Sequence, residues 1–359
     1  MSAPTTKSDV REDDGDSPGQ WDLDMSELDD SDKPEEEDIE ANPSSGQSVY
    51  DTDSVVAESG ISYHGYKPGK YYLPNDAAEQ DRLDIMHVSF RLLLGGKLAL
   101  APFQEPPRYV LDVGTGTGIW AIQFAEEHLD SQVIGTDLSA IQPRLTISNC
   151  SFQRDDAEEE IWLFPVPQNR FDYVHLRFMV TCFDEPRRVM ANAFEHLNPG
   201  GWIEFQDSIM PILDFNGKAE GTAIERWNQY AYSGGAALNR DFKKPSRYKE
   251  WLEETGFVDV KEHKIEWPMA PWPADARRKK AGWFLLRSLM NGFRGLSWAF
   301  LRAAGLSADE VETLVAECKK DLLNRKYAWY FGVYIVYGRK PAEGETGQSP
   351  ASSSASTPS

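Results

Sequence analysis

Two carboxylates flank three closely spaced glycines, and this arrangement is the clearest chemical signal in the 359-residue sequence. Asp112 precedes glycines at positions 114, 116 and 118, and Asp137 follows further along the chain. Glycine lets a backbone come close to a ligand, and carboxylates accept hydrogen bonds from hydroxyls or attract cations. Packing alone does not explain glycines with an acid on each side, so the spacing predicts a ligand site.

The residues around this run predict the elements that position it. Residues 109–113 form a β-branched and apolar stretch, which is typical of a strand buried on both faces of a parallel sheet. Residues 119–128 carry apolar side chains at helical spacing, and residues 133–137 read as a second strand ending on Asp137. Strand, glycine turn, helix, strand and acid make half of a nucleotide-binding fold. We therefore expect an α/β protein with a doubly wound, mostly parallel sheet.

Two cofactors use this layout. Nicotinamide and flavin sites carry the motif Gly-x-Gly-x-x-Gly. In this sequence the third glycine comes one position too early, and Ile119 stands where that motif has its last glycine. Asp-x-Gly-x-Gly-x-Gly instead resembles the S-adenosylmethionine site of class I methyltransferases. Asp112 would attract the methionyl ammonium, and Asp137 would accept hydrogen bonds from the ribose hydroxyls. Asp137 fits both cofactors, so the glycine spacing is what favours S-adenosylmethionine.

Further acids and bases follow the next predicted strands. Residues 150–153 suggest a third strand. After it, Asp156 is expected to accept a hydrogen bond from the adenine amino group, and the small Ala157 to leave room for the adenine ring. The competing interpretation of these acids is a helix N-terminus, where acidic residues are enriched. Residues 171–176 form a fourth strand with His175 and Arg177 at its carboxyl end, where ligands of open α/β sheets bind. Residues 202–205 form a fifth. The candidate bases are His175, Glu204 and Asp207.

An aromatic loop and a helix precede the first strand. Residues 63–75 end in a predicted helix cap at Asn75, and the helix that follows ends at Gly95-Gly96. A helix at this place can lie over the cofactor cleft. Tyr71 and Tyr72 are therefore candidates for contact with cofactor or substrate, with packing as the alternative.

Together these motifs resemble a class I S-adenosylmethionine-dependent methyltransferase, and more closely the LaeA-like methyltransferases of filamentous fungi. The resemblance implies a seven-stranded sheet closed by an antiparallel hairpin, and it adds Thr115 and Leu138 to the expected cofactor contacts. In one respect the chain departs from the family: where members carry a His before the last strand, it has Tyr327-Ala328-Trp329, so no base is assigned there. The matching segments are Tyr71 to Arg82, Gly114 to Ile122, Gly135 to Pro143, Asp172 to Arg177, Pro271 to Pro273 and Val336 to Pro341.

Composition bounds the rest of the chain. Residues 1–48 hold 16 acidic residues against three basic ones, so most of the net charge of −21 lies in what we expect to be a disordered tail, and residues 341–359 form a second one. The catalytic domain is expected over 49–340, with the cofactor core at 109–208 and substrate or lid insertions at 209–247 and 268–326. Several tryptophans make the insertions aromatic, which favours core packing over a substrate pocket.

The functional expectations differ in the methyl acceptor. A small molecule of fungal secondary metabolism is the first; the alternative is a regulator of secondary-metabolite genes that works in a protein complex and methylates proteins or itself. The absence of a signal peptide or an apolar span, together with three scattered cysteines, favours the cytoplasm, and Arg277 to Lys280 offers the nucleus as an alternative. The acidic balance argues against a nucleic-acid surface. A nicotinamide oxidoreductase is disfavoured by the glycine spacing.

Overall fold

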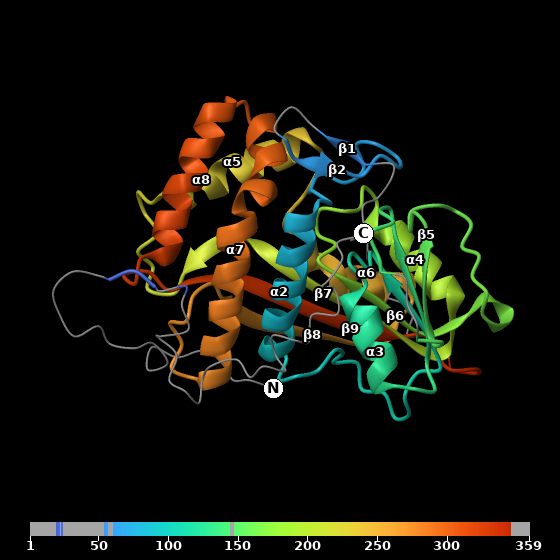
Figure 1. Ribbon diagram of the computed structural model, residues 1–359. Helices are drawn as coiled ribbons and strands as arrows, with labels where there is room; N and C mark the ends of the chain where they lie inside the picture. Colours follow the sequence, from blue (N-terminus) through green and yellow to red (C-terminus); the bar gives the residue numbers. More distant parts are fainter. Residues whose placement is uncertain (1–18, 22, 24–53, 57–59, 144–146, 346–359) are drawn as a thin grey trace, which may run out of the picture.

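A computed structural model describes residues 19–21, 23, 54–56, 60–143 and 147–345 (Figure 1). A seven-stranded sheet in the order β5-β4-β3-β6-β7-β9-β8 forms its centre. Five neighbouring strands pair in parallel, and β9 pairs antiparallel with β7 and with β8. The strands are β3 (Tyr109–Val113), β4 (Gln132–Asp137), β5 (Cys150–Arg154), β6 (Phe171–Arg177), β7 (Leu197–Asp214), β8 (Val258–Pro268) and β9 (Trp329–Arg339). This confirms the predicted fold class and its closing hairpin.

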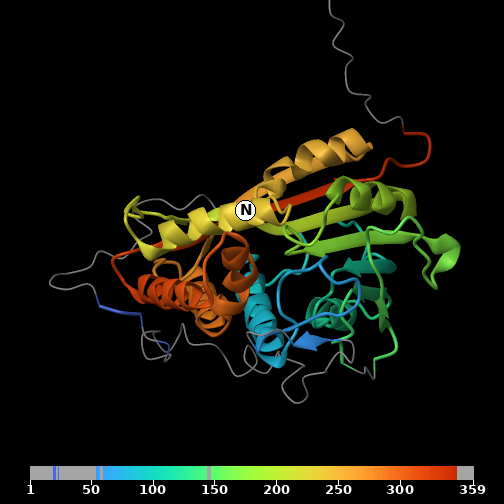
Figure 2. The ribbon, with the colours of Figure 1, turned by 90° about the horizontal axis from the view of Figure 1, so that it is seen from above.

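Helices cover both faces of the sheet. Figure 2 shows α6 on the face opposite to α2, with the sheet between them. α2 and α5 both pack on the long helix α7, and α8 packs beside it, on the side of the molecule away from β5 (Figure 1). The helices are α2 (Ala77–Leu93), α3 (Ile119–Glu127), α4 (Pro186–His196), α5 (Ala223–Ala237), α6 (Tyr248–Thr255), α7 (Ala276–Ala303) and α8 (Ala308–Leu323). A short hairpin, β1 (Val55–Val56) with β2 (Ser62–Tyr63), precedes α2.

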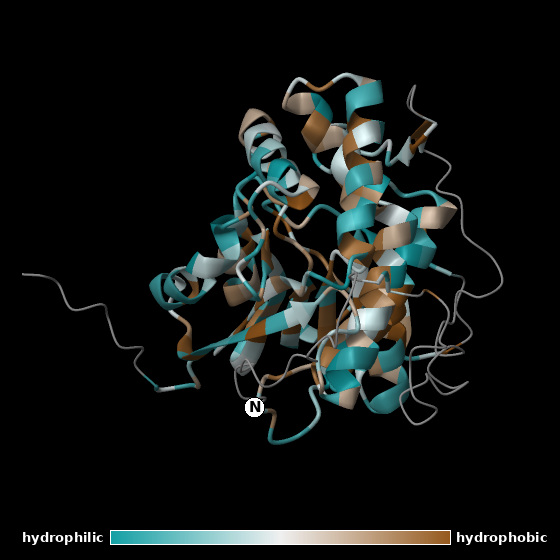
Figure 3. Ribbon diagram, turned by 90° about the vertical axis from the view of Figure 1, so that its left-hand side faces the viewer, coloured by the Kyte–Doolittle hydropathy of each residue, from teal (hydrophilic) through white to brown (hydrophobic). Residues whose placement is uncertain are grey.

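Apolar side chains gather in three main cores. The largest lies among α2, α5, α7, α8 and the far halves of β7 to β9, a second lies between the sheet and α4 and α6, and a third lies under α3. Figure 3 shows hydrophobic residues on the strands and on the inward sides of the helices, with hydrophilic residues on the outer turns. Because β3 is covered on both faces, four of its five residues are buried, as its apolar sequence predicts.

Several predicted boundaries are wrong. The cap of α2 is Asp76, whose side chain accepts from the Glu79 N–H; the neighbouring Asn75 instead bonds Ser54 and Ser62. β7 is much longer than the predicted 202–205, because the turn signal at 198–201 lies inside the strand and is accommodated by an irregularity in the pairing with β6. β8 is also long, with 11 residues.

Part of the predicted acidic tail packs on the folded domain. Trp21 is buried in the largest core, its N–H donates to Leu323 O at 2.6 Å, and the guanidinium of Arg325 lies over its ring. The expectation of a tail without packed residues is therefore wrong at this point, while residues 1–18, 22 and 24–48 lie outside the described part, as do residues 346–359. No helix in the described ranges is long and apolar enough to cross a membrane.

Candidate active site

A pocket opens at the carboxyl ends of β3, β4, β5 and β6, beside α2 and the aromatic loop before it. We call it the glycine-loop pocket. Gly118 is the N-cap of α3, but neither it nor Glu204 is among the lining residues. The other predicted site residues all line it: Asp112, Gly114, Thr115, Gly116, Asp137, Leu138, Asp156, Ala157, His175 and Arg177. The topology thus brings together residues that the sequence places on four separate strands.

The glycine turn needs glycine for two reasons. Gly114, Gly116 and Gly118 have φ values of 69°, 59° and 85°, a left-handed conformation that strains other residues. A Cβ atom would also lie 2.5 Å from Sδ of Met179 at Gly114, and 2.4 Å from the ring of Phe152 at Gly118. The side chains of Met179 and Phe152 already occupy the space beside the turn at these two positions, so packing requires glycine there as well.

Asp112 and His175 form a buried pair at the floor of this pocket. They lie directly opposite each other in the β3–β6 register, and His175 Nδ1 is 2.7 Å from Asp112 Oδ1. A carboxylate only accepts hydrogen bonds, so Nδ1 carries a proton, and in the neutral tautomer of the ring the lone pair lies on Nε2. The ring stacks on Trp120 at 3.7 Å between centroids, and Nε2 is buried without a partner in the described part of the chain. Thr115 Oγ1 donates to the second oxygen of Asp112 at 2.6 Å.

Asp137 is held by the backbone around it. Its Oδ2 accepts from Gly116 N at 2.9 Å and its Oδ1 accepts from Ser139 N at 2.8 Å. Burial raises the pKa of Asp137 to about 6, although both N–H donors favour the charged form. At neutral pH this carboxylate is therefore ionised, oriented and able to accept further hydrogen bonds from a ligand.

Asp156 pairs with two lysines of the aromatic loop. Its Oδ2 lies 2.9 Å from Lys67 Nζ and 2.6 Å from Lys70 Nζ, and its Oδ1 accepts from Glu158 N. Burial opposes its ionisation, but the hydrogen bonds from both ammonium groups outweigh burial and lower the pKa of Asp156. The neighbouring Asp155 also lines the pocket, and burial raises its pKa. Of the two adjacent acids, Asp156 is the one held ionised by cations.

Arg177 forms the positive end of the pocket. Its guanidinium lies near the rings of Phe90 and Phe178, 5.7 Å and 5.3 Å from their centroids, and desolvation lowers its pKa to about 10. One amino group donates to His87 Nδ1 at 2.8 Å, and the opposite ring nitrogen of His87 meets Gln123 Oε1 at 2.9 Å. Burial holds the pKa of His87 well below its usual range, so the ring is neutral and accepts from Arg177. A guanidinium held in this way suits an anionic ligand group.

Glu204 is not available for chemistry, and the structure corrects its prediction as a base. It lies beside His175 in the β6–β7 register, but its carboxylate is fully buried and accepts from the N–H groups of Leu100 and Ala101 and from two side chains, Tyr173 and Gln206. The carboxylate stabilises the loop before β3. Asp207 is likewise buried and accepts a hydrogen bond from Tyr248 at 2.7 Å. It lines neither the glycine-loop pocket nor the second pocket described below.

A second, apolar pocket adjoins the first. We call it the apolar pocket; it has a volume of about 130 Å³ and shares Tyr71, Leu83 and Phe178 with the glycine-loop pocket. Tyr72, by contrast, packs against Phe300 in the core. The rest of the wall of the apolar pocket comes mainly from helices α2, α5 and α7 and strands β7 to β9. It includes Met86, Met210, Trp227, Ala231, Phe242, Trp267, Leu285, Leu289, Phe300 and Phe331.

The wall between the pockets is an aromatic residue in an unusual conformation. Phe178 has a φ of 60° and stacks on Trp267 at 5.7 Å with an interplanar angle of 8°. Bulky residues rarely adopt left-handed backbone conformations, and such outliers cluster at functional sites. Of the described residues lining the apolar pocket, Arg82 alone carries a charge, and two hydrogen bonds of 2.7 Å pair it with Glu79.

Sequence reasoning missed residues that no local motif marks. Lys67, Lys70, His87 and Gln123 reach the site from elements remote in sequence. Phe178 follows the predicted fourth strand directly, so its position was the one signal available.

The geometry defines a class I methyltransferase site, and comparison with known proteins agrees. Residues 74–262 match the family described as Methyltransferase domain. The chain is 30% identical to methyltransferase pytC of Aspergillus terreus over 79% of its own length and 87% of that protein. It is 33% identical to the probable methyltransferase tdiE of Emericella nidulans, with 74% and 82% covered, and 33% identical to the secondary metabolism regulator LAE1 of Gibberella fujikuroi, with 82% and 96% covered. The chain belongs to the S-adenosylmethionine-dependent methyltransferases, within the LaeA-like group.

Proposed function

We propose that the protein transfers a methyl group from S-adenosylmethionine, bound in the glycine-loop pocket, to a small apolar molecule bound in the apolar pocket. The observation that carries this proposal is the direct junction of the two pockets at Tyr71, Leu83 and Phe178. One pocket is lined by charged groups and by a glycine turn, whereas the other is lined by aromatic and aliphatic side chains.

The charges of the glycine-loop pocket fit the parts of the cofactor. Asp112 and Arg177 offer opposite charges at one end, which match the ammonium and carboxylate of an amino acid. Asp137 would accept from the ribose hydroxyls, and Asp156 from the adenine amino group. At Gly116 a Cβ atom would meet only Cδ1 of Leu83, at 3.8 Å, so the turn is open to a bound molecule at this position.

The apolar pocket sets the class of acceptor. A cavity of about 130 Å³ is near the size that holds a single benzene ring. The stacked pair of Phe178 and Trp267 offers a flat surface for a ring. Because Arg82 is neutralised by Glu79, a charged acceptor would find no partner among the described lining residues. An apolar molecule, or the ring-bearing end of a larger one, fits this wall.

The residues of the site would act mainly by positioning. The cofactor supplies an electrophilic methyl on its sulfonium, so the protein must bring the acceptor atom into line with it and exclude water. Phe178 and Tyr71 would fix the acceptor at the junction. Where the acceptor loses a proton, Nε2 of His175 is the unprotonated nitrogen in the pocket, and Asp112 would stabilise the imidazolium that forms.

Mass spectrometry tests this proposal. The protein is incubated with fractionated fungal extract and cofactor carrying a deuterated methyl, and the small-molecule and protein fractions are searched for the added mass. We expect a labelled apolar small molecule that is absent with the Asp137→Ala variant. Label found only on proteins would contradict the proposed acceptor.

A second candidate is a regulator that methylates proteins or itself within a nuclear complex. The similarity to the protein named secondary metabolism regulator LAE1, over 96% of its length, favours it. The basic run from Arg277 to Lys280 supports nuclear import less than its sequence suggests, because it begins α7 and Lys279 is buried. A tagged copy in the cytoplasm would favour the small-molecule enzyme, and stable nuclear partners would favour the regulator.

A further inference from the structure

The loop before α2 forms part of the wall of the glycine-loop pocket. We call residues 64–72 the strap; two of them, Lys70 and Tyr71, line the pocket. His64 holds the strap together, because its ring nitrogens lie 2.7 Å from the carbonyl oxygen of Tyr66 and 3.2 Å from that of Tyr71. A loop tied to itself in this way can move as one unit.

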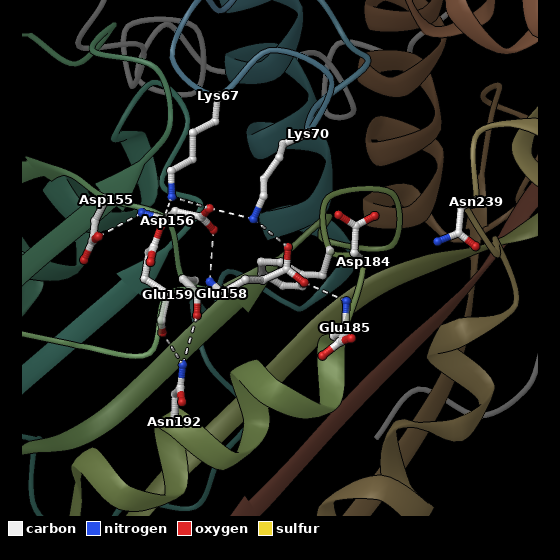
Figure 4. Close-up of polar contacts among 12 residues, drawn as sticks. Lys67, Lys70, Asp155, Asp156, Glu158, Glu159, Asp184, Glu185, Asn192 and Asn239 are labelled. Atoms are coloured by element: carbon white, nitrogen blue, oxygen red, sulfur yellow. Dashed lines mark hydrogen bonds and ion pairs between the residues drawn. The ribbon is translucent and has the colours of Figure 1, made fainter.

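Ion pairs fasten one side of the strap to the loop after β5. Figure 4 shows Lys67 and Lys70 pointing from the strap to the carboxylate of Asp156. Lys70 also lies 3.3 Å from Glu158, and Lys67 pairs with Glu159. The lysine side chains keep 26% and 29% of their surface exposed, whereas that of Asp156 keeps 5%. Water therefore reaches the cations of these pairs but hardly reaches the central anion.

A different contact fastens the opposite side. Arg240 is buried, donates to the carbonyl oxygen of Lys70 at 2.9 Å and pairs with Asp184. Its guanidinium lies over the ring of Tyr72 at 5.1 Å. Because the acceptor at Lys70 is an uncharged carbonyl oxygen, salt screens this contact less than it screens the lysine ion pairs, so it behaves as the hinge side of the strap.

We infer that the strap is a lid over the cofactor, and that Lys67 and Lys70 form a latch that opens and closes on Asp156 each time cofactor is exchanged. This inference rests on the proposed function, because it places adenine beside Asp156. The carboxylate that fastens the lid is then the one that recognises the base, so lid closure and base recognition occur at one residue.

The strength of the contacts suits a latch. Partly exposed ion pairs are individually weak, so thermal motion breaks them often, and salt screens them. Three or four such pairs acting together slow the opening of a loop without preventing it. The latch therefore controls how fast the cofactor enters and leaves more than how tightly it binds.

Stopped-flow measurement of Trp120 fluorescence tests the latch, because Trp120 lines the glycine-loop pocket. In the double variant Lys67→Ala/Lys70→Ala, association and dissociation of S-adenosylmethionine are both expected to become about tenfold faster. The dissociation constant should change by less than about threefold. Lys67→Arg/Lys70→Arg should retain the slow exchange, and Lys249→Ala, which removes an exposed pair with Glu253 on α6, should leave both rates unchanged.

Ionic strength provides a second measurement, which also serves if the double variant does not fold. Both rates of the unmodified protein should rise with added salt, and those of the double variant should not. Unchanged rates in the double variant, or a weaker affinity with an unchanged association rate, would overturn the latch. Failure of the unmodified protein to bind S-adenosylmethionine in calorimetry would instead overturn the proposed function.

Discussion

The glycine-loop pocket and the apolar pocket share a wall but recognise their ligands in opposite ways. The first uses carboxylates that hydrogen bonds orient: Asp137 by two backbone N–H groups, Asp112 by Thr115 and His175. The second uses shape, with its one charged lining residue in the described chain already paired. A cofactor that never changes can be met by fixed charges, whereas an apolar wall selects by size and fit.

This difference predicts that the two pockets respond separately to substitution. Changes in the first should alter the affinity for S-adenosylmethionine, and changes in the second should alter turnover of the acceptor alone. Each pocket can therefore be tested against the other as its control.

The largest effect is expected for Asp137→Ala. This change would remove the two charge-assisted hydrogen bonds that we propose Asp137 accepts from the ribose, so it should weaken cofactor binding by about 2–4 kcal/mol, on the order of a hundredfold. Calorimetry would measure it, with the exposed Asp130→Ala as the matched control. An unchanged affinity in the Asp137 variant would remove this residue from the site.

Filling the apolar pocket should leave cofactor binding intact. Ala231 is buried on α5 and lines this pocket, so Ala231→Leu inserts atoms where the acceptor would lie. Formation of labelled product should fall about thirtyfold, the equivalent of about 2 kcal/mol, while S-adenosylmethionine affinity stays within about twofold. Ala191→Leu on the exposed side of α4 serves as control. If cofactor affinity collapses as well, the two pockets are not separate.

The pH dependence should reside in the charged pocket. Burial raises the pKa of Asp137 to about 6, so cofactor affinity is expected to rise about tenfold between about pH 5 and 7, as the carboxylate ionises. For the unliganded fold the sign is opposite: the raised pKa adds stability at low pH, and this contribution is lost as pH rises through about 6. Titration of Asp137→Asn should show a much flatter binding profile, and a profile as steep as that of the unmodified protein would assign the dependence elsewhere.

The smallest effect is expected for the stability of variants at Phe178, the residue between the two pockets. Phe178→Gly and Phe178→Ala both remove the ring, but only glycine relieves the backbone at a φ of 60°. The glycine variant should therefore be more stable than the alanine variant by about 1 kcal/mol in urea unfolding. Equal stabilities would show that the left-handed conformation of Phe178 costs little.

How far the site follows from sequence depends on whether its residues are local. The glycine turn and Asp137 lie within one strand-turn-helix-strand unit, so spacing alone brings them together. His175 also follows, since a parallel sheet aligns the carboxyl end of β6 with that of β3. The helix cap is predicted at Asn75, but it is the next residue, Asp76. Both residue types cap helices, so the local sequence does not show which of the two neighbours is the cap.

The wrong assignment of Glu204 has a physical cause. It shares a row with His175 across β6 and β7, as its place in the strand suggested. Whether that row meets a ligand depends on the loop at residues 98–101, which folds over Glu204 and takes its hydrogen bonds. The contact between Lys70 and Asp156 could not be predicted from the sequence either, because the two residues are 86 positions apart and only the fold brings them together.

Trp21 has a practical consequence for protein engineering. Because its ring fills part of the core beside α8 and its backbone bonds Leu323, a shortened version that starts after it would leave an empty socket lined by apolar side chains. Removal of residues 1–18 should preserve solubility and melting temperature, whereas removal of residues 1–21 should lower both. Crystallisation trials that trim the acidic segment should therefore keep Gly19 to Trp21.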